Sequence, residues 1–104
     1  MIRHTVFFRL KHPSGSAAEL DFLHAAQRLA GIPGVWKFER LRQISEKNAF
    51  TLGFSMEFAD EDAYRGYLEH REHERFVRER WTKEVEDFLE VDCVPFGPLV
   101  PTPI

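Results

Sequence analysis

The chain has 104 residues, a formal net charge of −3, and 43 % apolar and 30 % charged residues. This length supports one domain that buries roughly 60–65 % of its unfolded surface without disulfides. A mildly acidic balance of mixed sign argues against nucleic acids and anionic membranes as partners, because both attract a concentrated basic field.

The composition also bears on where the protein is found. A single cysteine, Cys93, rules out an intramolecular disulfide. The first ten residues are too short and too interrupted by charge to form the apolar segment of a signal peptide. No stretch approaches the roughly 20 apolar residues that a membrane span needs. We therefore expect a cytoplasmic protein with no membrane partner.

The first predicted element is a strand over residues 2–10, because its side chains alternate between two faces. One face carries His4 between apolar residues, and the opposite face carries Thr5, Phe7 and Arg9. The strand therefore has two faces that can each contact another layer.

A helix is predicted from about residue 17 to residue 30, where small and apolar side chains recur at helical spacing. Ser14 and Ser16 precede it and are candidate N-caps. The segment 31–34, Gly-Ile-Pro-Gly, ends the helix, because glycine and proline terminate helices.

Two further strands are predicted on either side of a hairpin-type turn at residues 46–48. The first covers residues 35–45, with Trp36, Phe38 and Ile44 on one face. The second covers residues 50–58 and alternates strictly. Its apolar face consists of Phe50, Leu52, Phe54, Met56 and Phe58. Helices must cover this apolar face.

A second helical region begins at the N-cap Asp60 and continues beyond residue 80. Its predicted apolar stripe consists of Phe76, Val77, Trp81, Val85 and Phe88. The Arg and Glu side chains of residues 71–86 are expected to form a solvated face with i,i+4 pairs. A fourth strand over residues 88–94 and a proline-rich tail over residues 95–104 follow.

The predicted order is β-α-β-β-α-β, which indicates an α+β, ferredoxin-like fold with a four-stranded antiparallel sheet and both helices on one face. We assign residues 1–94 to the domain and residues 95–104 to the tail. The uncovered sheet face carries Thr5, Phe7, Arg9, Ser55 and Glu57. A second copy of the chain is the economical partner for that face, with Arg9 and Glu57 as candidates for an ion pair there and the tail along the dimer seam.

Residues capable of acid–base chemistry crowd into the second helical region. Tyr67 and His70 are neighbours on one helix face, whereas His73 lies about 120° from Tyr67 around a straight helix. A bend near Arg71 would bring Tyr67 and His73 to one pocket, although no proline marks it.

Three motifs together resemble the stress-responsive α/β-barrel domain (Dabb) family. They are Ile2-Arg3-His4-Thr5-Val6, Ile32-Pro33-Gly34-Val35, and Tyr67-x-x-His70-x-x-His73-x-x-Phe76. The resemblance extends to about residue 94 and implies a dimeric α/β barrel in which two sheets pack together. The residue after His70 is Arg71, where the family usually has proline.

The resemblance also implies a function. The family includes plant stress-induced proteins, bacterial members with no assigned activity, and the olivetolic acid cyclase type of polyketide cyclase, which performs an aldol condensation. The residues here that match its catalytic set are His4, Tyr67 and His73. In the predicted roles His73 is the base, Tyr67 donates to the developing oxyanion, and His4 orients one of them or the substrate.

Other side chains are predicted to bind the ligand or to serve the structure. The candidate ligand-binding residues are Val6, Phe8, Phe22, Phe54, His70, Phe76 and Trp81. His4 has a structural alternative as a hydrogen-bonded core residue, and Tyr67 has one as a core tyrosine with its hydroxyl at the rim. His70 has an alternative in which it ties the helix break to a backbone carbonyl. The spacing of His70 and His73 permits metal chelation, but no H-E-x-x-H motif or cysteine pair supports it. We expect no metal and no cofactor.

Three functions from different classes follow from this sequence. A cofactor-independent lyase or cyclase acting on an apolar carbonyl compound requires an open cavity with His4, Tyr67 and His73 on its wall. A non-catalytic ligand-binding or stress-response homodimer has the same fold, with the cavity filled by Phe side chains. A cofactor-free monooxygenase would oxidise a phenolic substrate with oxygen. The residues do not choose among cyclisation, tautomerisation and cleavage.

Overall fold

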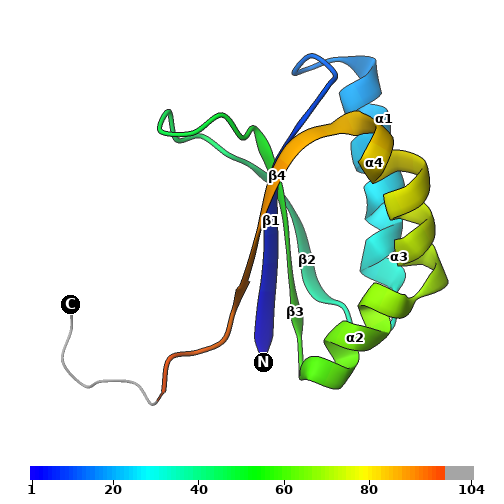
Figure 1. The fold of residues 1–104 in the computed structure, drawn as a ribbon, viewed down its shortest axis with the longest axis vertical. Helices are drawn as coiled ribbons and strands as arrows, with labels where there is room; N and C mark the ends of the chain where they lie inside the picture. The colour runs from blue at the N-terminus through cyan, green and yellow to red at the C-terminus, as the bar shows by residue number, and fades with distance from the viewer. Residues whose placement is uncertain (98–104) are drawn as a thin grey trace.

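Four antiparallel strands form one sheet, with the order β2-β3-β1-β4, in the computed structural model, which describes residues 1–97 (Figure 1). The strands are β1 (Ile2–Leu10), β2 (Trp36–Arg42), β3 (Leu52–Phe58) and β4 (Val85–Cys93). Each of the two crossover connections, from β1 to β2 and from β3 to β4, contains helices that lie on the same face of the sheet (Figure 1). The predicted ferredoxin-like fold is confirmed.

The helical layer consists of several short pieces. They are α1 (Ala17–Ala26), the 3₁₀ turn η1 (Gln27–Gly31), α2 (Glu61–Glu69), α3 (Arg71–Phe76), the π-helical turn η2 (Val77–Trp81) and α4 (Thr82–Glu84). Two of the predicted N-caps are present. The Ser16 hydroxyl accepts from the backbone N–H of Glu19 at 3.2 Å, and the Asp60 carboxylate accepts from that of Ala63 at 2.8 Å.

Strand register decides which side chains face the helices. Val6 lies opposite Phe54 on β3 and Glu90 on β4, whereas Phe7 lies opposite Gly53 and Leu89. Because side chains alternate along a strand, the even-numbered residues of β1 face the helices and the odd-numbered ones face away. The largest fully buried side chains are Phe8, Phe22, Phe54, Phe58 and Met56. The core therefore lies between the sheet and the helices, as the alternation predicts.

The prediction that Trp36 and Phe38 share a face of β2 is wrong. The register shifts between Trp36 and Glu39, and Lys37 has a positive φ of 50°. Such a bulge puts one extra residue into the strand and reverses the alternation. Phe38 consequently packs on Phe54 with ring centroids 5.6 Å apart, while Trp36 remains 66 % exposed.

The helical region ends earlier than the apolar stripe predicts. The helices stop at Glu84, so Val85 and Phe88 belong to β4 instead of a helical stripe. Their spacing of three residues fits a helix, but pairing with β1 decides, since Val85 lies opposite Leu10 and Phe88 opposite Phe8. A register shift between Arg9 and Leu10 allows both residues to lie opposite helix-facing positions of β1. The other predicted boundaries differ from the observed ones by a few residues.

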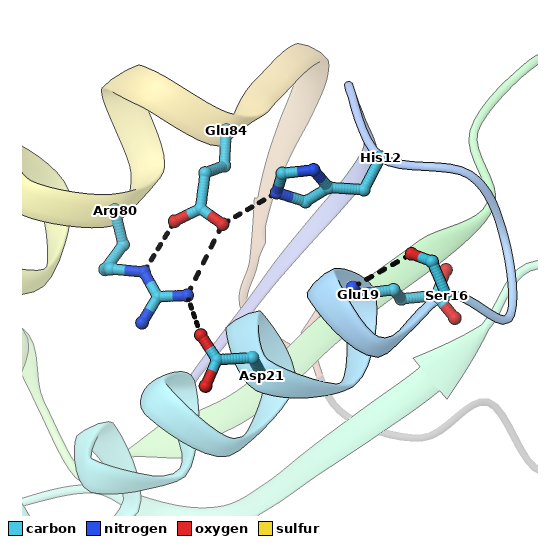
Figure 2. A network of polar contacts seen from close by, with 6 residues as sticks. All are labelled: His12, Ser16, Glu19, Asp21, Arg80 and Glu84. Atoms are coloured by element: carbon cyan, nitrogen blue, oxygen red, sulfur yellow. Dashed lines mark hydrogen bonds and ion pairs between the residues drawn. The ribbon is translucent and has the colours of Figure 1, made fainter.

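A network of ion pairs joins the helical layer to the loop after β1 (Figure 2). Arg80 on η2 donates to the carboxylates of Glu84 and Asp21, and Glu84 also bonds His12 Nε2 at 2.7 Å. Burial alone would raise the pKa of Glu84, but the hydrogen bonds and charges of Arg80 and His12 outweigh it and hold this pKa below 4.5. The predicted solvated Arg/Glu face thus contains one partly buried network.

The end of the chain lies mostly outside the described residues. Phe96 is described and is exposed. Leu99, Val100 and Ile104, together with the predicted position of the tail on a partner subunit, lie outside residues 1–97. Within that range no helix is both long enough and apolar enough to cross a membrane.

Candidate active site

A cavity of about 560 Å³ opens between the sheet and the helices α2 to α4. His4, Tyr67 and His73, the three predicted catalytic residues, all line it. Four of the predicted ligand-binding side chains also form its wall, namely Val6, Phe54, Phe76 and Trp81. The volume lies within the range of small-molecule pockets, roughly 300–1,000 Å³.

The helix break that the sequence analysis placed near Arg71 occurs at His70. This residue has an extended backbone, with φ −69° and ψ 139°, and it both ends α2 and begins α3. His70 Nδ1 accepts from the backbone N–H of Glu72 at 3.1 Å. The predicted partner, a carbonyl, was wrong, because the unsatisfied groups at a helix start are N–H groups. Arg71 occupies the first helical position, where proline is also favoured.

The break brings side chains of two helices together. Tyr67 at the end of α2 and His73 on α3 lie with ring centroids 4.6 Å apart. His4 on β1 approaches Tyr67 with a centroid distance of 6.4 Å. On a straight helix Tyr67 and His73 would point about 120° apart. The extended residue His70 is therefore the local feature that assembles the cluster.

His4 is held by two groups that the sequence analysis did not identify. Its Nδ1 lies 2.6 Å from Asp92 Oδ1 and 2.9 Å from the hydroxyl oxygen of Tyr64. The Tyr64 hydroxyl donates to the other Asp92 oxygen at 2.9 Å. A carboxylate only accepts, so the proton of His4 is on Nδ1 and a neutral ring has its lone pair on Nε2.

His73 is oriented in a similar way by the backbone. Its Nδ1–H donates to the carbonyl oxygen of Leu68 at 3.1 Å. Burial lowers the pKa of His73 below its ordinary 6.5, and the proximity of His4 lowers it further, although the Leu68 carbonyl and Glu90 act in the opposite direction. His73 is therefore neutral at pH 7, with Nε2 able to accept a proton.

Tyr67 supplies the complementary donor. The residue is only 2 % exposed, and none of the hydrogen bonds among the described residues involves its hydroxyl, which is open to the cavity and is not a buried atom without a partner. Burial raises the pKa of Tyr67, and the negative charge of Glu90 raises it further. The phenol thus remains protonated at neutral pH and can donate to a ligand in the cavity.

Three predicted ligand-binding residues do not line this cavity. Phe8 and Phe22 are fully buried, and their rings pack on each other with centroids 5.8 Å apart. Both belong to the core cluster between the sheet and the helices. His70 caps α3 instead. Within residues 1–97 no group of three or more His, Cys, Asp or Glu side chains is arranged to hold a metal ion.

Asp92, Tyr64 and Glu90 were the residues that sequence reasoning missed. Phe88, Glu90 and Asp92 alternate with Leu89, Val91 and Cys93 along β4, and they lie opposite the helix-facing residues of β1. Acidic residues at two successive helix-facing positions are unusual for a core strand. This pattern was the available signal that β4 contributes to a site.

Comparison with known proteins identifies the family. A family model described as the stress-responsive A/B barrel domain matches residues 2–95. The chain belongs to the stress-responsive A/B barrel domain family. A crystal structure of a family member with a ferredoxin-like fold, from Mesorhizobium loti, is 57 % identical, with a TM-score of 0.91, and the match covers 92 % of this chain and 97 % of that one.

More distant structures share the family fold. A hydroxynitrile lyase from Passiflora edulis is 16 % identical with a TM-score of 0.78, and the match covers 95 % of this chain and 96 % of that one. A dimeric ferredoxin-like protein of unknown function from Thermobifida fusca is 18 % identical with a TM-score of 0.72, and the match covers 90 % of each chain. No curated protein matches the sequence significantly.

Proposed function

We propose that the protein binds an apolar carbonyl compound in the cavity and catalyses a cofactor-independent proton transfer on it, in a lyase or cyclase reaction. One observation carries this proposal. The cavity holds a protonated phenol, Tyr67, beside His73, an imidazole whose Nδ1–H is tied to a backbone carbonyl. A hydrogen-bond donor and a proton acceptor on an apolar wall suit chemistry at a carbonyl group.

The proposed reaction begins when His73 Nε2 takes a proton from the carbon next to the carbonyl. The C–H electron pair forms a carbon–carbon double bond, and the carbonyl π electrons move to oxygen. Tyr67 donates a hydrogen bond to that developing oxyanion. In a tautomerisation the imidazolium then returns the proton to the enolate oxygen or to another carbon of a conjugated enolate. In an aldol cyclisation the enolate carbon attacks a second carbonyl group of the ligand, the π electrons of that carbonyl move to its oxygen, and the imidazolium protonates the resulting alkoxide.

His4 orients the substrate in this scheme. Asp92 and Tyr64 hold its Nδ1, which directs the remaining nitrogen, Nε2, to the ligand. The proximity of His4 also lowers the pKa of His73, which keeps the base unprotonated. Cleavage of a carbonyl adduct uses the same two groups in reverse, and the hydroxynitrile lyase from Passiflora edulis shares the fold.

Hydrogen exchange tests this proposal without knowledge of the natural substrate. Phenylacetone serves as the probe, and ¹H NMR follows the replacement of its α-protons in D₂O. The wild-type protein should accelerate exchange, with and without oxygen. His73→Ala should lower the enzymatic rate by about 10²-fold or more, because a general base contributes roughly that factor.

Two variants complete the experiment. Tyr67→Phe should also slow exchange, since it removes the oxyanion donor and leaves the ring in place. His24→Ala, on α1 and outside the cavity lining, is the matched histidine control and should exchange like the wild type. Unchanged exchange in His73→Ala would remove the base from the mechanism, and a strict need for oxygen would favour the monooxygenase.

We also infer that the protein is a homodimer, formed through the outer face of the sheet. There the Phe7 ring packs against Gly53, so closely that a Cβ at position 53 would lie only 3.0 Å from the ring. Nearby Leu89 and Val91 are 51 % and 37 % exposed. Arg9 and Glu57, the predicted interface pair, contact Glu86 and Lys37 of their own chain. A sheet face that carries Phe7, Leu89 and Val91 among polar side chains suits a partner sheet.

Sedimentation equilibrium tests the dimer. The wild-type protein should sediment as a dimer at micromolar concentration, with a total interface above about 1,000 Å². Leu89→Arg should dissociate it, because the substitution places a charge on the outer face. Ile44→Arg, at an exposed position beyond β2, is the control and should leave the dimer intact. A wild-type monomer at micromolar concentration would contradict this inference.

A further inference from the structure

The rim of the cavity is acidic. Glu86, Asp87 and Glu90, all from β4, belong to its lining, which contains no Lys or Arg among the described residues. Arg9 pairs with Glu86 at 3.0 Å and neutralises it. Neither Asp87 nor Glu90 forms an ion pair within the part of the chain that the structure describes. No Lys or Arg of the wall therefore compensates these two carboxylates.

Aromatic rings lie in the same wall as these carboxylates. Trp81 and Phe88 meet edge to face with centroids 5.6 Å apart, and both line the cavity. Phe88 is 49 % exposed, so it is accessible to a ligand. A carboxylate beside aromatic faces is the environment that binds organic ammonium groups, since ring faces attract cations and carboxylates neutralise them.

The cavity wall also carries a neutral hydrogen-bonding group, the hydroxyl of Tyr67. The Tyr67 hydroxyl takes part in none of the hydrogen bonds among the described residues, and it is open to the cavity although the residue is only 2 % exposed. It is the donor for a carbonyl oxygen. Glu90 and Tyr67 line the same cavity, and the charge of Glu90 raises the pKa of Tyr67. The acidic rim and the Tyr67 hydroxyl therefore belong to one site.

We propose that the natural ligand is a carbonyl compound that also carries a positively charged amine or quaternary ammonium group, with Glu90, Trp81 and Phe88 binding the cation while Tyr67 binds the carbonyl oxygen. This proposal rests on the carbonyl chemistry proposed above and adds its substrate class. A carboxylate-bearing substrate is disfavoured, because it would place a further negative charge at the rim.

Three probes built on one acetophenone core test the charge preference. They are 4-acetyl-N,N,N-trimethylanilinium, its uncharged isostere 4-tert-butylacetophenone, and the anion 4-acetylbenzoate. Calorimetry should show the cation binding at least about threefold more tightly than the isostere and at least about tenfold more tightly than the anion. The preference should shrink as salt is added, since surface charges are screened over roughly 10 Å at 0.1 M.

Glu90→Gln should remove most of the preference for the cation while leaving the affinity for the isostere within about twofold. Glu46→Gln is the matched control, because it removes the same charge at the turn after β2. Equal affinity for cation and isostere, or a preference that Glu90→Gln leaves intact, would overturn the cation proposal alone. Failure of all three probes to bind would overturn the carbonyl-binding function as well.

Discussion

Two imidazole–carboxylate pairs, at opposite ends of β1, have nearly the same geometry but different surroundings. His4 lies 2.6 Å from Asp92, and His12 lies 2.7 Å from Glu84. In the first pair the imidazole is 7 % exposed and the carboxylate 44 %, whereas in the second the values are 27 % and 17 %. In the first pair His4 lines the cavity, whereas the second pair belongs to the ion network of Figure 2.

The difference lies in which hydrogen-bonding groups are already used. Glu84 is held by both His12 and Arg80, and Arg80 also reaches Asp21. Each member of this network has a partner of opposite charge, so the network stabilises the fold. The cluster around His4 uses only Nδ1 and leaves its other nitrogen to the cavity. A polar network with unused groups on a cavity wall is suited to a ligand, and a closed one is suited to structure.

Removing one carboxylate from each pair gives the largest expected contrast. Asp92→Asn should lower kcat/KM of the proposed reaction by about tenfold or more, because His4 loses the charge that fixes its tautomer. Glu84→Gln should leave kcat/KM within about twofold and lower the free energy of unfolding instead. Steady-state kinetics and urea denaturation measure the two effects. Equal kinetic losses in both variants would erase the distinction.

The ion network itself should contribute to stability. Arg80→Gln should lower the free energy of unfolding by about 1–3 kcal/mol, because it leaves the partly buried Glu84 with only His12. Arg75→Gln breaks a comparable i,i+4 pair with Glu79, but both side chains there are about half exposed. That control should cost under about 0.5 kcal/mol. Similar urea midpoints for the two variants would show that the network adds nothing.

The cap at the helix break should link stability to the site. His70→Ala should cost about 1 kcal/mol, because the N–H of Glu72 loses its acceptor. The same variant should also lower turnover, since the break holds Tyr67 near His73. His70→Asn retains a side-chain acceptor and should therefore restore most of the stability and most of the turnover. Thermal unfolding and α-proton exchange provide the measurements, and wild-type behaviour of His70→Ala would count against the cap.

The smallest expected effect is on the pH dependence of stability, in which His73 of the cavity and Glu84 of the ion network act in different pH ranges. The pKa of His73 is lower in the folded protein than its ordinary value of 6.5. Between the folded and the ordinary pKa the unfolded chain binds more protons than the folded chain, so stability falls as the pH falls. The folded pKa of Glu84 is below 4.5, so its contribution is lost only as the pH falls below 4.5. His73→Gln should flatten the first window of a stability–pH curve, and Glu84→Gln the second. An unchanged profile in either variant would refute that assignment.

The sequence by itself determined the order of the elements and the candidate residues of the site. Strict alternation in residues 50–58 and the N-caps Ser16 and Asp60 depend on neighbours along the chain, so local rules suffice for them. The set of His4, Tyr67 and His73 came from a family resemblance in the residues. All three side chains line one cavity in the structure.

Only the tertiary structure decided which residues serve that site. His4 and Asp92 are 88 positions apart and meet because β4 pairs with β1 in one particular register. The bulge at Lys37 and the start of β4 at Val85 are likewise set by pairing with a neighbouring strand. A periodic pattern records which side chains are apolar, but the partner across the sheet depends on register, which packing of the whole domain selects.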